Sequence, residues 1–243
     1  MDLKEQALNP HRHPWELSRA DMALGLLSPN GNPKRYADIG SGDLYFARRL
    51  TELNADRVYA VDIHYAVQQN ENRLIVCTDL HQVPSRSVDC AILMDVLEHV
   101  KDDVGLLRDV TRILTDAGEL LITVPAHAFL WSEHDVFLGH FRRYTRAMLH
   151  DAVRRGGFHA TETFYFYAIP WVASAMTVGL AKVGVARTHA GAVGRWPFSL
   201  NHPLTKTLRR VLNADFRASR ALGTGPLAGC GLSIAMRCRR TSA

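Results

Sequence analysis

The sequence predicts an α/β fold, built on a doubly wound, mostly parallel sheet with helices on both faces. Short apolar stretches of strand length alternate with segments whose apolar residues recur at helical spacing. This alternation is typical of parallel strands buried on both faces. A glycine turn follows the first predicted strand, as in sheets that hold an adenosine-containing cofactor at their carboxyl edge. With 243 residues, 47% of them hydrophobic, the chain can form one large domain.

The first part of the chain contains a regular series of predicted elements. An N-terminal helix runs from Trp15 to Leu27 and ends in a loop rich in proline, glycine and asparagine at 28–33. Strands are predicted at 35–39, 57–62, 73–78, 88–94 and 118–125. Helices are predicted at 44–53, 102–115 and 145–155.

Capping residues support the boundaries of the last two of these helices. Asp102 or Asp103 can accept hydrogen bonds from the free amides at the start of the helix at 102–115. Gly118 lies just past its end, where a left-handed residue is often required. Thr145 is expected to cap the next helix, which stops at the glycines 156 and 157.

The C-terminal part holds a long insertion between two predicted strands. A β-prone run covers 159–169, and the final strand covers 231–238. The residues between them, 170–225, exceed what a hairpin needs. The stretch 170–186 is apolar except for Lys182. It is only about 17 residues long, begins with a proline and contains glycines, so a lid helix is expected and not a membrane span. A basic amphipathic helix from Leu204 to Leu222 either packs on the domain or lies on an anionic membrane.

The distribution of charge and the first residues of the chain limit the possible binding partners and the cellular compartment. Residues 187–243 carry ten Lys or Arg and one acid, so this segment holds +9 and the rest holds −4 of the net +5. The segment either meets an anionic partner or forms a solvated basic face. No apolar run follows the charged start of the chain, so we expect no secretory signal and a cytoplasmic protein. The four cysteines lack close paired spacing and are expected to be reduced.

The glycine turn narrows the choice of cofactor. It reads Asp38-Ile39-Gly40-Ser41-Gly42, and an acid, Asp62, ends the second predicted strand, where it can bind a ribose diol. A dinucleotide site would have a third glycine at position 45, which is Tyr45. The acid at Asp38 disfavours a pyrophosphate and suits a ligand that carries an ammonium group. The residues thus point away from NAD.

At these positions the chain resembles the class I S-adenosylmethionine-dependent methyltransferases. The resemblance covers residues 12–168 and the last strand, and it rests on these segments: Asp38 to Gly42, Asp62, Asp79-Leu80, Asp89 to Leu93, Asp95 to His99 and Leu114 to Leu120. It implies a Rossmann-like, doubly wound, seven-stranded sheet, mostly parallel with an antiparallel last strand, plus a helical lid insertion. Leu44 stands where the family usually has a glycine.

The resemblance also implies a division of the chain and a set of cofactor-binding residues. Within a single methyltransferase domain, 1–33 form the N-terminal helix and loop, 34–169 the cofactor-binding core, 170–225 the lid and 226–243 the last strand. The implied cofactor is S-adenosylmethionine, with S-adenosylhomocysteine as product. Asp38 supports the turn or the amino group, and the other implied contacts are Gly40, Ser41 and Gly42 with the methionine and ribose, Asp62 with the ribose, Ile63, Asp79 and Leu80 with the adenine, and Asp95 and Val96 closing the site.

Two polar clusters follow the fourth and fifth predicted strands. Asp95, Glu98 and His99 would share one face of a helix and resemble the Glu-x-x-Glu-His segment of ubiquinone-type O-methyltransferases, where that cluster can bind a divalent ion. Three interpretations stay open, namely a base or acceptor-site residue at His99, a metal cluster, or structural hydrogen bonds at a helix start. We assign no metal ligand from the sequence.

The second cluster runs from Trp131 to Asp135 and from Gly139 to Tyr144. It resembles segments of bacterial methyltransferases linked to cell-surface sugar or lipid biosynthesis. Together with His99, the predicted catalytic residues are His134, Arg143 and Tyr144. Arg142 or Arg143 can bind an acceptor anion or tie the loop to the sheet, and His140 is either functional or structural. At the front, Trp15 and Arg19 either fold over the cofactor or only pack.

These observations predict methyl transfer to an oxygen of a small-molecule, sugar or lipid-linked acceptor. The alternatives are a nucleic-acid or N-methyltransferase, and an S-adenosylmethionine-binding module without catalysis. A nucleic-acid substrate is disfavoured because the fourth strand ends in Met94-Asp95-Val96-Leu97 and not in an Asn-Pro-Pro-type turn. Contact with the inner face of the membrane through 170–225 stays open.

Overall fold

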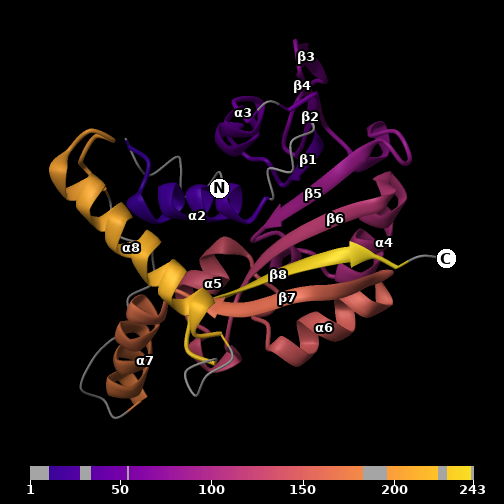
Figure 1. Cartoon of the computed structure of the whole chain (residues 1–243). Helices are drawn as coiled ribbons and strands as arrows, with labels where there is room; N and C mark the ends of the chain where they lie inside the picture. Colours follow the sequence, from indigo (N-terminus) through magenta and orange to yellow (C-terminus); the bar gives the residue numbers. More distant parts are fainter. Residues whose placement is uncertain (1–10, 28–33, 54, 183–195, 224–228, 242–243) are drawn as a thin grey trace.

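An eight-stranded sheet runs through the computed structural model, which describes residues 11–27, 34–53, 55–182, 196–223 and 229–241 (Figure 1). The predicted loop at 28–33 and parts of the predicted insertion, 183–195 and 224–225, lie outside the described residues. The strands are β1 (Arg35–Ile39), β2 (Arg57–Val61), β3 (Gln69–Glu71), β4 (Leu74–Cys77), β5 (Val88–Met94), β6 (Leu114–Pro125), β7 (Phe158–Phe166) and β8 (Ser233–Arg240).

The strand order is β3-β4-β2-β1-β5-β6-β8-β7. The five strands from β4 to β6 in this order are parallel, and β8 runs antiparallel to both β6 and β7. The prediction of a mostly parallel sheet with an antiparallel last strand is therefore confirmed. The chain order reverses between β1 and β5, and in open α/β sheets such a switch point marks the ligand crevice.

The predicted count of seven strands was one too low. The additional strand, β3, pairs antiparallel with β4 at the edge of the sheet, and all three of its residues are exposed. Its hairpin turns at Asn72, which has a φ of +50°. Three polar residues carry no apolar pattern, and for this reason the sequence did not predict the strand.

Helices cover both faces of the sheet and form two cores. On one face, α4 (Asp103–Ile113) and α6 (Arg146–Arg155) bury Leu107, Val110 and Leu149. On the other face, α2 (Pro14–Leu26), α3 (Tyr45–Thr51) and α8 (Pro203–Ala221) bury Met22, Leu50 and Phe216. This double cover explains why the strands are apolar on both sides.

The caps confirm two of the predicted helix boundaries and correct a third. The Asp102 carboxylate accepts from the Gly105 amide at 2.8 Å, and the Thr145 hydroxyl accepts from the Met148 amide at 3.2 Å. The prediction of a left-handed cap at Gly118 was wrong. The helix ends at Ile113, and β6 begins at once, so that Gly118 lies inside the strand without a positive φ.

The predicted insertion contains two helices in the described residues. In Figure 1, α8 lies beside α2, and α7 (Ala168–Lys182) extends away from the sheet. None of residues 168–179 is buried, although most of them are apolar. Among the residues that the structure describes, no helix is long and apolar enough to cross a membrane.

The start of α3 keeps a glycine-like backbone without a glycine. Leu44, the residue before the helix, has φ +64° and ψ 3°. A side chain in this left-handed conformation costs roughly 1–2 kcal/mol. Leu44 packs partly buried against the core, and this packing offsets part of that cost.

We predict that Leu44→Gly is more stable than Leu44→Ala by about 1 kcal/mol. Both changes remove the leucine side chain. The difference between their free energies of unfolding therefore measures the cost of a residue with a Cβ in the left-handed conformation. At an ordinary helical position the order is reversed, with Ala more stable by about 0.5–1 kcal/mol. Urea unfolding of the two variants measures the difference. If Leu44→Ala were the more stable variant, Leu44 would not be left-handed.

Candidate cofactor and acceptor site

The carboxyl ends of β1, β2 and β5 meet at one edge of the sheet, and the chain leaves β1 there through a tight turn. Gly40 and Ser41 both donate backbone hydrogen bonds to the carbonyl oxygen of Val61, at 2.8 and 3.1 Å. Gly40 and Gly42 have φ values of +73° and +54°. Residues with a side chain rarely adopt these values, so the two glycines let the turn fold over the end of β2.

Gly40 and Val96 lie in direct contact, as expected if both border one site. A Cβ on Gly40 would lie 2.5 Å from Cγ2 of Val96, so a larger residue does not fit without displacement. Val96 follows β5 and precedes the short 3-10 helix η2 (Leu97–His99). The glycine turn therefore faces the switch point between β1 and β5 at close range.

Asp62 ties the turn to the end of β2. One carboxylate oxygen accepts from the Gly42 amide at 2.9 Å, and the other accepts from the His64 amide at 2.9 Å. Each carboxylate oxygen has a second lone pair, so both oxygens can still accept a ribose hydroxyl. The position, the charge and the remaining acceptor capacity fit an adenosine-containing cofactor.

Asp38 lies buried beneath the turn. Its carboxylate accepts from the Ser41 hydroxyl at 2.7 Å. Burial raises the pKa of Asp38 to about 6, and the Ser41 hydrogen bond opposes that shift only in part. The Tyr65 hydroxyl donates to the Gly42 carbonyl at 2.8 Å and holds the turn from its other side. A carboxylate in this place attracts a cationic ligand group.

The three residues predicted around the adenine lie after β2 and β4, at the same edge. Ile63 is 81% exposed next to Asp62, whereas Leu80 is buried. The Asp79 carboxylate accepts from the His81 amide at 2.6 Å and caps the 3-10 helix η1 (Leu80–Gln82). An exposed isoleucine beside a ribose-binding acid is available to cover a flat ring.

The N-terminal helix forms the front wall of a cavity at this edge. Two arginines of this region form ion pairs across the cavity. Arg12 pairs with Asp43 and Glu16, and Arg19 pairs with Asp95. Sequence reasoning raised Arg19 but missed Arg12, whose only signal was a positive charge ahead of the helix. The cavity is lined by Arg12, Glu16, Arg19, Ala20, Asp38, Gly40, Ser41, Asp43, Tyr45, Phe46 and Met94.

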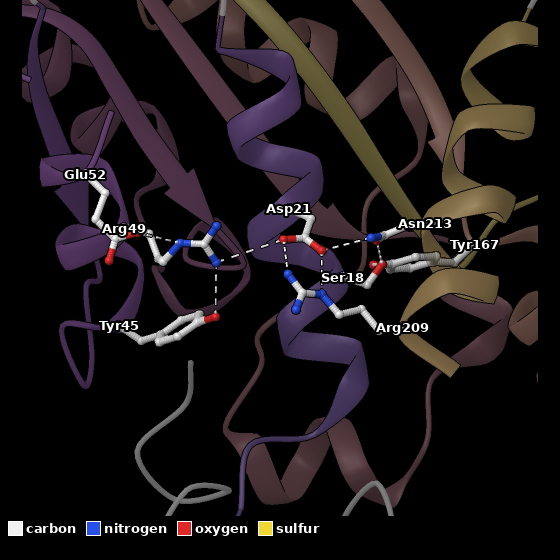
Figure 2. A network of polar contacts seen from close by, with 8 residues as sticks. All are labelled: Ser18, Asp21, Tyr45, Arg49, Glu52, Tyr167, Arg209 and Asn213. Atoms are coloured by element: carbon white, nitrogen blue, oxygen red, sulfur yellow. Dashed lines mark hydrogen bonds and ion pairs between the residues drawn. The ribbon is translucent and has the colours of Figure 1, made fainter. Parts of the chain in front are cut away.

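A polar network fixes α2 in this position. Figure 2 shows Asp21 at its centre, bound by Arg209 and Asn213 of α8 and by Arg49 of α3. The Asn213 amide oxygen also accepts from Ser18 of α2 at 2.7 Å. The helix α8 therefore holds α2 over the cavity through side chains that are partly buried.

The segment from Asp95 to His99 does not form the α-helical face that the spacing predicted. Asp95 has a left-handed φ of +52°, and only Leu97–His99 form a single 3-10 turn. Asp95 turns toward α2, where it pairs with Arg19 and accepts from Thr123 at 3.1 Å. Glu98 is fully buried instead, and burial raises its pKa to about 8.

Arg143 and Tyr144, two of the predicted catalytic residues, are held by other side chains. Arg143 binds the buried Asp135 carboxylate through Nε and Nη2, at 2.8 and 3.0 Å. Tyr144 is 1% exposed and donates to Asp103 at 2.7 Å, and burial raises its pKa above the ordinary value. Arg142 likewise pairs with Asp103 at 2.7 Å. These contacts tie the loop to the sheet, and the catalytic roles of Arg143 and Tyr144 stay predictions.

His134 lies on a short helix, α5 (Glu133–Leu138), which the sequence analysis treated as a loop. Ser132 and Asp135 form a capping box at its start, a signal that the sequence contained. Asp135 also binds His140, whose Nδ1 atom lies 2.9 Å from Oδ1 of Asp135. Burial would raise the pKa of Asp135, but His140 and Arg143 outweigh it and hold that pKa well below its usual range.

A further histidine near this edge of the sheet, His127, was not predicted from the sequence. It follows β6 with a φ of +62° and stacks on Tyr165, with ring centroids 5.0 Å apart. Burial lowers its pKa, so the ring is neutral at pH 7. The segments after β5 and β6 thus bring four histidines to the ligand edge, namely His99, His127, His134 and His140.

Several solved structures are similar to this chain in fold. A 1,6-didemethyltoxoflavin-N1-methyltransferase of Burkholderia thailandensis, solved with S-adenosylhomocysteine, is 16% identical over 94% of this chain and 81% of its own, with a TM-score of 0.54. An S-adenosylmethionine-dependent methyltransferase of Mesorhizobium loti is 16% identical over 93% and 97%, with a TM-score of 0.54. The [4+2]-cyclase SpnF is 15% identical over 97% and 85%, with a TM-score of 0.57. At these identities the likeness shows the fold alone.

Comparison of sequences identifies the family. No curated protein matches the chain. The methyltransferase domain family matches residues 15–163, which is more than half of the chain. The match spans the N-terminal helix, the glycine turn, the acid after β2 and the segments after β5 and β6 that carry the four histidines. The chain therefore belongs to the methyltransferase domain family.

Proposed function

We propose that the protein methylates a hydroxyl oxygen of a small, apolar or lipid-linked acceptor. The sulfonium of S-adenosylmethionine supplies an activated methyl group with a neutral leaving group. As the carbon–sulfur bond breaks and the carbon–oxygen bond forms, the hydroxyl proton must pass to a base. The observation that carries the proposal is the group of four histidines in the segments after β5 and β6, because histidine is the side chain best suited to take a proton near neutral pH.

His134 is the residue that we propose as this base. It lies on α5, directly after β6 and η3 (Ala128–Leu130), and its Nδ1 atom is buried. His99 and His140 face each other and Glu98, so they are engaged in a different cluster. In this proposal α2, as a wall of the cavity, aligns the reactants and excludes water. These two effects are the main contributions of a protein to a displacement at carbon.

The exposed apolar residues near the histidines support an apolar acceptor. On α7, Ile169, Val172 and Met176 are exposed at helical spacing on one side of the helix. Phe129 and Trp131, in the segment before α5, are also exposed. Such side chains in one region of a protein are more typical of an interaction surface than of a solvated one.

The first prediction concerns cofactor affinity. Asp62→Ala removes a carboxylate whose hydrogen bonds to ribose are worth about 1.5–3 kcal/mol, so the Kd for S-adenosylmethionine should rise about 10- to 150-fold in calorimetry. Asp56→Ala, at the opposite end of β2 and exposed, is the matched control and should bind normally. Unchanged affinity in Asp62→Ala, or tight binding of NAD without any response to S-adenosylmethionine, would contradict the assignment of Asp62.

The second prediction concerns pH. Because burial raises the pKa of Asp38 to about 6, the carboxylate is ionised above that pH and loses its charge below it. A cationic amino group binds only the ionised form well, so affinity should fall about tenfold for each pH unit below 6. Asp38→Asn should bind more weakly at pH 7 and lose this dependence. An identical pH profile in the variant would exclude Asp38 as the titrating group.

The third prediction tests the acceptor class. A panel of hydroxylated and amino acceptors, apolar and polar, is incubated with S-adenosylmethionine, and formation of S-adenosylhomocysteine is followed by mass spectrometry. We expect turnover with apolar hydroxyl compounds, and His134→Ala should lower kcat about 10²- to 10⁴-fold without changing the Kd of the cofactor. His159→Ala, exposed on β7, is the control.

Two outcomes would contradict this proposal. Turnover with amines alone would favour an N-methyltransferase, and unchanged kcat in His134→Ala would remove that base. Cofactor binding without product from any acceptor would favour a binding module instead of an enzyme.

A further inference from the structure

The helix α7 lies at the surface of the molecule, although residues 168–181 contain no charged side chain. Ile169 and Met176 are 61% and 63% exposed. Val172, at 48%, lies on the same side of the helix, because the three positions follow one another at intervals of three and four residues. A surface helix normally turns charged or polar side chains toward water. The exposed side of α7 is therefore suited to contact with another apolar surface.

The apolar surface of α7 continues onto η3 and the residue after it. The ring centroid of Trp171, on α7, lies 6.0 Å from that of His127, and the ring of Phe129 lies 5.3 Å from His127 on η3's side. Phe129 and Trp131 are 49% and 40% exposed. Tryptophan and phenylalanine are frequent on the apolar face of helices that lie in a membrane interface.

A line of positive charge runs along the exposed side of α8. Three exposed basic residues, separated by four and seven positions, lie along one side of the helix: Lys206, Arg210 and Arg217. None of the three forms an ion pair with a residue that the structure describes, whereas Arg209 and Arg220 of the same helix pair with Asp21 and Glu162. The single acid of α8, Asp215, is buried. The exposed side of α8 thus carries positive charge and no negative charge.

Apolar side chains lie beside this line of charge, on the part of α8 that is next to α7. They are Leu204, Val211 and, just after the helix, Leu222, which are 47%, 44% and 54% exposed. Asp215 lies one helical turn after Val211, and its Oδ1 atom accepts from the Ile169 amide at 3.4 Å. In Figure 1, α7 begins near α8 and extends away from the sheet. The two helices therefore present apolar side chains in one region, with the basic residues at its border.

The charge of this region distinguishes between two possible partners. A second copy of the chain, related by a two-fold axis, would bring its own basic residues to the same contact, and like charges oppose such an interface. An anionic lipid bilayer attracts the basic residues and accepts the apolar ones. Lysine and arginine can place their charged ends among headgroups while their alkyl parts contact apolar groups.

We propose that α7, η3 and the exposed side of α8 bind the surface of an anionic lipid bilayer. The apolar side chains of α7 enter the boundary between headgroups and acyl chains, and Lys206, Arg210 and Arg217 contact the lipid phosphates. The proposal concerns the place at which the protein binds. It does not depend on the methyl acceptor or the base, so its failure would leave the proposed function unaffected.

The experiment mixes the full-length chain with vesicles and measures the bound fraction by flotation. One set of vesicles contains phosphatidylcholine and phosphatidylglycerol in equal parts, and the other contains phosphatidylcholine alone. We expect the protein to float with the anionic vesicles at low salt and to bind the neutral ones more weakly. Added salt should decrease binding to the anionic vesicles, because it screens the attraction between the basic residues and the lipid phosphates.

Two combined variants test the apolar and the charged parts separately. Ile169→Gln with Met176→Gln should lower the partition coefficient at least tenfold, because two exposed apolar side chains no longer enter the bilayer. Replacement of the three basic residues of α8 should lower partition into anionic vesicles about 100-fold. This variant is Lys206→Gln with Arg210→Gln and Arg217→Gln.

Matched controls make the same kinds of change on other exposed parts of the chain. Leu53→Gln with Val67→Gln replaces two exposed apolar residues near α3 and β3, at the end of the molecule opposite α7 in Figure 1. The control for charge is Arg48→Gln with Arg57→Gln and Arg108→Gln, all exposed. Each control should bind at least tenfold more tightly than the variant that it matches. Circular dichroism shows whether each variant is folded.

Three results would overturn the proposal. The first is a wild-type chain that does not float with anionic vesicles at low salt. The second is wild-type binding in either folded test variant. The third is a dimer, detected by light scattering, that Ile169→Gln with Met176→Gln dissociates while vesicle binding is absent, since a second copy would then be the partner.

Discussion

The hydrogen bond from the Gly42 amide to the Asp62 carboxylate, at 2.9 Å, is the constraint on which the site depends. It joins the turn after β1 to the end of β2, and the two glycines of positive φ exist so that the turn can reach that carboxylate. The same fold of the turn brings Gly40 against Val96 at the end of β5. One acid therefore fixes the turn between the ends of β1, β2 and β5, where we propose that an adenosine-containing ligand binds.

Beyond the sheet, the site depends on helices that the chain contributes from its two ends. The helix α2 closes the front of the cavity with Arg19, and Arg12 lies just before the helix. The helix α8 holds α2 there through Arg209 and Asn213 (Figure 2). An exposed ion pair contributes little to stability, but this network is partly buried and shared among several groups. We infer that its main effect is to fix the orientation of α2, and with it the shape of the site.

Local patterns in the sequence predicted most of the fold and placed Asp38 and Asp62 at the ends of neighbouring strands, whereas the roles of these acids toward a cofactor stay predictions. The apolar strands, the caps at Asp102 and Thr145 and the spacing from Asp38 to Asp62 are short-range signals that the structure confirms. The polar strand β3 carried no such signal, and the capping box of α5 was overlooked. The meeting of Glu98 with His140 and of Asp21 with Arg209 joins residues far apart in the chain, and only the tertiary structure could reveal it.

The central claim is that the turn and Asp62 hold S-adenosylmethionine at the switch point between β1 and β5. A crystal structure of the chain with S-adenosylhomocysteine tests it most directly. We expect the ribose hydroxyls within hydrogen-bond distance of Asp62, the adenine beside Ile63 and Leu80, and the amino group near Asp38. Density for the ligand at any other place, or a ribose that does not contact Asp62, would contradict the claim.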